Sequence, residues 1–207
     1  MLDTNNESRL VCNMNESWDD YAEGWDGNED VISYSDKAFR TLCEVVNPEG
    51  LLILDFGCGT GLLTERMAIT ADRVVAVDPS EKMISVLQHK QLSNVETLIA
   101  VLSEETINTY DLFRSKYDLI VASSVCSFLP DYEGTLRLLK TLLKPNGIFV
   151  QWDWLKSGED DDSGFNEERI ESAYQRVGLE KLSITEAFSI ESEAGPMKVI
   201  MGAARNA

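Results

Sequence analysis

The sequence has 207 residues, of which 43% are hydrophobic, and this suits one domain with its own buried core better than two. Lys and Arg number 18 against 36 Asp and Glu, so the formal net charge is -18 at pH 7. A charge of this sign and size repels a phosphate backbone and argues against nucleic acid as a partner.

The apolar runs and the cysteines indicate the cellular compartment in which we expect this protein. No run approaches the roughly 20 apolar residues needed to cross a bilayer, and the first residues lack the basic and apolar regions of a secretory signal. Cys12, Cys43, Cys58 and Cys126 are too scattered for a metal knuckle or a redox pair. We therefore expect a soluble, cytoplasmic protein with neither a membrane partner nor a metal site. His89 is the only histidine, which excludes most catalytic triads.

The acidic excess is concentrated in residues 1–36 and 157–171. One interpretation is a negative rim that attracts a cationic substrate. The other is a solvated surface that keeps the protein in solution, and this second interpretation is favoured because charge runs usually have that role.

The first expected element is a helix that begins at Ser17, with Asp20 three positions later in a pattern like a capping box. Trp18, Tyr21 and Trp25 then follow at i, i+3 and i+7, which places three aromatic side chains on one helix face. This face either packs on the domain or forms a lid over a ligand.

The polar residues 26–30 break this helix, and a second helix is expected around Ala38, Leu42 and Val45. We expect residues 1–46 to form an N-terminal helical cap or lid, and residues 47–207 to form one compact domain.

Within that domain, apolar runs of strand length alternate with segments of helical period, which is typical of a parallel sheet covered by helices on both faces. Buried strands are expected at residues 51–56, 73–78, 95–100, 117–123 and 148–152. A further helix around residues 170–177 should end at Gly178, whose lack of a Cβ suits the left-handed position after a helix.

The last two strands determine the sheet type. Residues 183–191 and 197–204 are joined by only five residues, whereas a parallel crossover needs a dozen or more. They must pair as an antiparallel hairpin. The predicted fold is therefore α/β, in three αβα layers, with a mostly parallel seven-stranded sheet whose last strand is antiparallel. Dinucleotide dehydrogenases instead continue in parallel to the end of the sheet.

Residues 55–61 (DFGCGTG) lie at the carboxyl end of the first strand, just before a helix. Glycine at alternate positions lets the backbone turn sharply and approach a ligand closely. The loop is not a P-loop, because no Gly-Lys-Ser/Thr follows, and Leu62 breaks the dinucleotide pattern Gly-x-Gly-x-x-Gly/Ala. Asp78 ends the second strand 17 residues after Gly61, where an acid can accept hydrogen bonds from both hydroxyls of a ribose.

With these features the sequence resembles the class I S-adenosylmethionine-dependent methyltransferases, which have a Rossmann-like fold. The resemblance runs from about Asp55 to Ala204. It includes the glycine loop, Asp78, residues 117–121 (YDLIV) and residues 143–147 (LKPNG). It implies binding of S-adenosyl-L-methionine, with S-adenosyl-L-homocysteine as the product.

The resemblance also implies roles for residues. Asp55 and the glycine loop would hold the methionine end of the cofactor, Asp78 its ribose, and Pro79 and Met83 its adenine. Residues 18–22 (WDDYA) look like the segment that closes over cofactor and substrate in many small-molecule members. The cofactor-binding residues that we expect are Tyr21, Asp55, Gly57, Cys58, Gly59, Gly61, Asp78, Pro79, Met83, Ser103 and Ser123.

One position departs from the family pattern. Val101 stands where the family usually has an acid that bonds the adenine amino group, and we expect Ser103 to substitute for it. Apolar enclosure and the ribose contact then supply the remaining affinity.

The absence of two sequence motifs narrows the chemical class of the methyl acceptor. No Asn/Asp-Pro-Pro-Tyr follows the fourth strand, which argues against amino methylation of nucleobases or glutamine by that route, and no Asp-Asn pair suggests a catechol-type metal site. We therefore predict a small soluble acceptor and a monomer or homodimer. Tyr21, Ser127, Asp131, Trp152 and Asp153 come from regions that should face the crevice, but the sequence assigns a catalytic role to none of them.

Two other functions remain open at this point. One is a catalytically inactive domain that binds S-adenosylmethionine as a sensor or partner subunit. The other is a nicotinamide oxidoreductase, which the glycine spacing and the terminal hairpin both disfavour.

Overall fold

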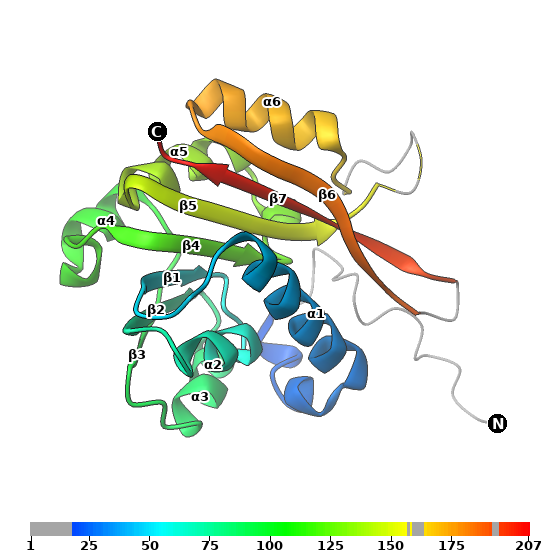
Figure 1. Ribbon diagram of the computed structural model, residues 1–207. Coiled ribbons are helices and arrows are strands. Elements are labelled where there is room, and N and C mark those ends of the chain that lie inside the picture. The colour runs from blue at the N-terminus through cyan, green and yellow to red at the C-terminus, as the bar shows by residue number, and fades with distance from the viewer. Residues whose placement is uncertain (1–17, 157, 159–163, 192–194) are drawn as a thin grey trace.

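The computed structural model describes residues 18–156, 158, 164–191 and 195–207. A seven-stranded sheet crosses the molecule in the order β3-β2-β1-β4-β5-β7-β6 (Figure 1). The strands are β1 (Leu52–Phe56), β2 (Arg73–Asp78), β3 (Val95–Ile99), β4 (Tyr117–Ser123), β5 (Leu143–Trp154), β6 (Glu180–Ile190) and β7 (Met197–Arg205).

Helices cover both faces of this sheet. On one face lie α1 (Glu29–Val45), α2 (Leu62–Ala68) and α3 (Glu81–His89), and on the other lie α4 (Glu104–Thr109), α5 (Tyr132–Leu142) and α6 (Glu167–Val177) (Figure 1). Successive β1 side chains alternate between the two cores, since Ile53 packs with α1 and α2 while Leu54 packs with α5 and α6. The predicted three-layer α/β fold is confirmed.

The terminal hairpin adopts the predicted direction. β7 pairs antiparallel with both β5 and β6, and all other neighbouring strands are parallel. β7 therefore lies between two strands that precede it in the chain. Its residues Val199 and Ala203 join the core under α1 and α2.

The N-terminal segment differs from the predicted helix. Ser17 lies outside the described residues, and two short 3-10 turns, η1 (Trp18–Asp20) and η2 (Trp25–Gly27), stand where a continuous helix was expected. Gly24 interrupts the segment because it adopts a left-handed conformation with φ 83°. α1 then starts after Asn28, whose side chain accepts a hydrogen bond from the Asp30 amide at 3.0 Å.

Two further differences concern α4 and β5. α4 had no counterpart among the predicted elements. β5 begins at Leu143 rather than at Ile148, because Leu143 pairs with Tyr117 before the following turn bulges out of the sheet, and Ile148 then pairs with Leu119. Gly178 follows α6 in the left-handed conformation, as expected.

Candidate functional site

The loop after β1 depends on glycine for two different reasons. Gly57, Gly59 and Gly61 all have positive φ angles, of 71°, 54° and 80°. A Cβ on Gly57 would lie 2.5 Å from Val125 Cγ2, and a Cβ on Gly61 would overlap Leu87. A Cβ on Gly59 would meet no atom within 4 Å, so this glycine faces open space. The loop is packed at both ends and open in the middle.

Asp55 lies beneath this loop and is 1% exposed. Its Oδ2 accepts a hydrogen bond from Thr64 Oγ1 at 2.6 Å, while its Oδ1 is buried with no hydrogen-bond partner in the described part of the chain. Burial raises the pKa of Asp55 to about 7, and the neighbouring Asp78 adds to the rise while the Thr64 hydrogen bond opposes it. A cationic group brought close to Asp55 would stabilise its charged form.

Asp78 ends β2 and fastens the same loop. Its Oδ2 accepts a hydrogen bond from the Gly59 amide and its Oδ1 one from the Ser80 amide, both at 2.9 Å. Burial raises the pKa of Asp78 above its ordinary value, and the two amides oppose that rise. Each carboxylate oxygen retains a lone pair, so Asp78 can brace the loop and still accept from a ligand.

A cavity of about 370 Å³ opens beside these two acids. Nine of the eleven residues predicted to bind the cofactor line it, which are Tyr21, Asp55, Gly57, Cys58, Gly59, Asp78, Pro79, Met83 and Ser123. These residues come from the N-terminal segment, the glycine loop and the carboxyl ends of β2 and β4. The sheet edge predicted from the sequence is therefore the edge where the cavity lies.

Two predicted residues are not among those that line the cavity. Gly61 is the N-cap of α2, packed against Leu87. Ser103 caps α4, where its Oγ accepts a hydrogen bond from the Thr106 amide at 3.1 Å. Val101 lines the cavity instead and is 70% exposed.

Four of the aromatic rings that line the cavity lie close to one another. The ring centroids of Trp18, Tyr21 and Trp25 are 6.1 to 6.3 Å apart, and Phe128 lies 5.1 Å from Trp18, edge to face. The predicted shared aromatic face therefore exists although the predicted helix does not. We call residues 18–27 the lid segment.

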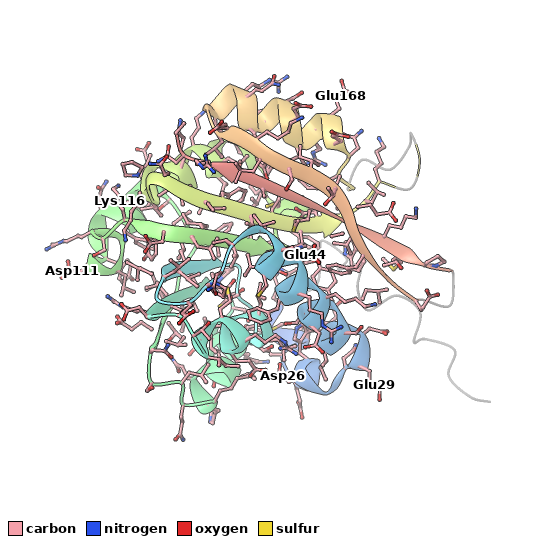
Figure 2. All side chains as sticks on the ribbon, viewed as in Figure 1. Asp26, Glu29, Glu44, Asp111, Lys116 and Glu168 are labelled. Atoms are coloured by element: carbon pink, nitrogen blue, oxygen red, sulfur yellow. The ribbon has the colours of Figure 1, made fainter. Side chains whose placement is uncertain are left out.

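The lid segment is attached to α3 at both ends of that helix. Asp19 Oδ1 accepts hydrogen bonds from Ser80 Oγ at 2.5 Å and from the Lys82 amide at 3.3 Å. At the other end, Lys90 Nζ lies 2.8 Å from Asp26 Oδ2. Asp26 lies beside the helical layer that contains α3, whereas Glu29, Asp111 and Glu168 are on the outer surface (Figure 2).

The cavity is also lined by residues that the sequence did not single out. Tyr34 and Ser35 come from α1, and Trp154 from the end of β5. The sequence analysis pointed instead to Trp152 and Asp153, which are fully buried elsewhere. Because side chains alternate along a strand, a β5 extended by two residues would have revealed Trp154.

Asp153 belongs to a separate buried network on the α5 and α6 face of the sheet. Its Oδ2 accepts from Gln151 Nε2 at 2.8 Å and its Oδ1 from the Ser127 amide at 3.2 Å. Gln151 in turn accepts hydrogen bonds from the hydroxyls of Tyr132 and Tyr174. Burial raises the pKa of Asp153 to about 7, while its hydrogen bonds oppose the rise. This network supports the turn that carries Phe128.

Comparison with known proteins agrees with this geometry. Residues 54–149 match a family model described as a methyltransferase domain. An uncharacterized methyltransferase of Schizosaccharomyces pombe is 30% identical over 116 residues, which are 53% of this chain and 41% of that protein. A ubiquinone biosynthesis O-methyltransferase of Bradyrhizobium diazoefficiens is 32% identical over 102 residues, covering 49% and 39%. The chain thus spans about two fifths of these relatives.

Solved structures match over nearly the whole chain. A SAM-dependent methyltransferase from Aquifex aeolicus has a TM-score of 0.72 at 21% identity and covers 91% of this chain and 98% of its own. A DhpI-SAM-HEP complex has a TM-score of 0.66 at 18% identity, covering 90% and 93%. The chain has the Rossmann-like methyltransferase fold that its motifs predicted.

Proposed function

We propose that this chain is an S-adenosylmethionine-dependent methyltransferase that transfers a methyl group to a small-molecule acceptor. The observation that carries the proposal is the meeting of the glycine loop, Asp78 and the aromatic lid segment around one cavity. The matched methyltransferase domain covers the glycine loop and Asp78, and it points in the same direction.

The residues present fit the cofactor. The space in front of Gly59 allows close approach of a ligand to the backbone, and the unpaired Asp55 Oδ1 offers an acceptor to an ammonium group. Asp78 would accept from the ribose hydroxyls, and Pro79 and Met83 would lie against the adenine. Cys58, Ser123 and Tyr21 would complete the wall. Gly61 would act by shaping the loop, and Ser103 only through the position of α4.

Bound S-adenosylmethionine supplies an electrophilic methyl group on a sulfonium. This methyl group would pass to a lone pair of the acceptor, S-adenosylhomocysteine would leave with the electron pair of the broken carbon–sulfur bond, and any acceptor proton would go to solvent or a base. The chain's own contribution is to align the acceptor and exclude water, and alignment alone supplies on the order of 7–11 kcal/mol. The lid segment would exclude water, and we assign no general base.

The proposal also covers the cellular location, the oligomeric state and the partners of the protein. We propose a cytoplasmic monomer or homodimer that binds neither nucleic acid nor a metal, and a net charge of -18 supports the absence of nucleic acid. None of the helices that the structure describes combines the length and apolarity needed to span a bilayer. Within the predicted 1–46 cap, we propose that residues 18–27 act as the lid, because α1 packs on the sheet.

A ligand screen tests the proposal. The melting temperature should rise with S-adenosylmethionine and S-adenosylhomocysteine, but not with NAD or ATP, because a ligand that binds only the folded state stabilises it. Transfer of label from S-adenosylmethionine across a metabolite panel then separates an enzyme from an inactive sensor or partner subunit. A rise with NAD alone would overturn the proposal.

A further inference from the structure

The order of the strands sets the direction in which a nucleoside would lie across the site. β1 pairs with β2 and β2 with β3, and β3 is an edge strand of the sheet (Figure 1). The glycine loop follows β1, and Asp78 ends β2 in register with Ile99 of β3. With the methionine end of the cofactor at the glycine loop and the ribose at Asp78, the base must lie on the β3 side.

The lining residues that follow β2 and β3 form what we call the base end of the cavity. They are Pro79, Met83, Ala100, Val101 and Leu102, and all have apolar side chains. The Met83 sulfur is a weak acceptor, and Met83 is only 2% exposed. Val101 is 70% exposed, so the base end is open to solvent at this residue. A flat base can pack against these side chains, but its amino group finds no strong acceptor among them.

The polar groups beside Val101 are bonded to one another. Ser103 Oγ lies 2.9 Å from Thr106 Oγ1 and accepts a hydrogen bond from the Thr106 amide at 3.1 Å. Thr106 Oγ1 in turn donates to the Val101 carbonyl at 2.8 Å. These bonds hold the start of α4, and a base would have to compete with them for the same atoms.

The carboxylates of the cavity lie away from its base end. Among the described residues that line the cavity, the acids are Asp55 on β1, Asp78 at the end of β2, and Asp131 in the connection from β4 to α5. β4 adjoins β1 on the side away from β2 and β3. Asp78 is committed to the ribose, so none of the three is placed to accept from the base. Tyr21 of the lid segment is the remaining polar side chain to be tested.

We infer that no side chain in the described part of the chain recognises the 6-amino group of the adenine, and that Val101 is the residue responsible for this tolerance. The amino group then faces water at the open edge beside Val101. Apolar contacts and the ribose hold the nucleoside. The inference rests on the proposed function, and it adds which part of the cofactor the site does not select.

Two analogues of S-adenosylhomocysteine test the wild-type protein by calorimetry. One has hydrogen in place of the 6-amino group, and the other carries a benzyl group on that nitrogen. Both keep the ring nitrogens, so contacts of the backbone with those atoms are unchanged. We expect each analogue to bind within about threefold of S-adenosylhomocysteine, because no protein group is left unpaired by the change. A loss of more than about threefold for either analogue would overturn the inference.

A gain-of-function substitution tests the role of Val101. Val101→Asp places an acceptor at the open edge, and S-adenosylhomocysteine should then bind about 2- to 13-fold more tightly than the deamino analogue, beyond any difference in wild type. Ile99→Asp is the matched control, because Ile99 is 46% exposed on the same strand but is not among the described residues that line the cavity. The ratio of the two affinities is the readout, since an effect of charge or folding alters both ligands alike.

Two further variants test the side chains that could recognise the amino group instead. Ser103→Ala and Tyr21→Phe should change the affinities for S-adenosylhomocysteine and for the deamino analogue by the same factor. A ratio that changes in either variant would assign the amino group to that residue and contradict the inference.

The outcomes separate this inference from the proposed function. If S-adenosylhomocysteine does not bind to the wild-type protein, the proposed function fails. If it binds but the deamino analogue binds more than about threefold more weakly, the tolerance is wrong and the proposed function stands. An unchanged ratio in Val101→Asp would show that the base does not lie beside Val101, and would also overturn the inference.

Discussion

Lys90 Nζ, at the C-terminal end of α3, lies 2.8 Å from Asp26 Oδ2 of the lid segment and 2.9 Å from Glu65 Oε2 of α2. The Lys90 side chain is only 15% exposed. One cation thus joins the lid both to the helix that begins after Asp78 and to the helix that begins after the glycine loop. Asp26 therefore has a structural role, because its ion pair with Lys90 attaches the lid segment to these two helices.

The first prediction concerns this attachment. Asp26→Asn should favour lid opening by about 1 kcal/mol, the upper range for a partly exposed ion pair, and speed release of S-adenosylhomocysteine about fivefold. Glu65→Gln removes the other partner of Lys90 but no lid contact, and serves as the matched control. Hydrogen exchange of residues 18–27 and stopped-flow release measure the effect. Equal behaviour of the two variants would show that Asp26 does not hold the lid.

The second prediction concerns Asp78. Asp78→Ala should weaken S-adenosylhomocysteine binding by about 1.5–3 kcal/mol, or roughly 10- to 150-fold, because a hydrogen bond to a charged group is lost. Asp78→Asn should lie between wild type and Ala, since its amide oxygen can still accept from a loop amide. Calorimetry measures the affinity, and exposed Asp72→Ala is the control. Wild-type affinity in Asp78→Ala would remove this residue from the site.

The third prediction uses urea unfolding to separate two reasons for a glycine, which are a positive φ angle and the lack of space for a Cβ. Gly50 and Gly57 have nearly the same φ, 70° and 71°, but a Cβ on Gly50 meets nothing while one on Gly57 lies 2.5 Å from Val125. Gly50→Ala should therefore cost about 1–2 kcal/mol for backbone strain alone. Gly57→Ala should cost roughly 1–3 kcal/mol more for overpacking, and Val125→Ala should recover only that additional part. Equal costs for the two single variants would contradict the packing role.

The fourth prediction concerns pH. The folded-state pKa of Asp55, about 7, is above its ordinary value of 3.8, so the folded state binds more protons than the unfolded state between these values. The contribution of Asp55 to stability is then fully present below about pH 4 and is lost as the pH rises through about 7.

Asp55→Asn should accordingly flatten the decline of unfolding free energy between about pH 4 and 7. Asp153→Asn should do the same independently, because burial raises its pKa in the same direction. Urea unfolding at several pH values measures both slopes. A slope as steep in Asp55→Asn as in wild type would show that Asp55 does not titrate in this range.

The sheet could be predicted from the sequence because its signals are local. Residues 51–56 form an apolar run of strand length that is followed by alternating glycines, and the six-residue connection between β6 and β7 permits only an antiparallel pair. The position of β7 between β5 and β6 is not a local property, because a hairpin can join a sheet by either of its strands.

The site was predictable where a backbone constraint marks it, as at Gly57 and Asp78. It was not predictable where two uses compete for one side chain. Ser103 has the chemistry to bind a base, but the free amides at the start of α4 are closer to it. Trp154 was missed because the apolar run of β5 ends before it and pairing with β7 extends the strand.

The insertion of β7 also constrains how the protein emerges from the ribosome. Until residues 197–205 leave the exit tunnel, β6 has no neighbour and β5 has an open edge, so the nascent chain exposes two unpaired strand borders. Completion of the sheet must wait until β7 can enter between two earlier strands, so the chain is most exposed to misassembly while β7 is still inside the exit tunnel.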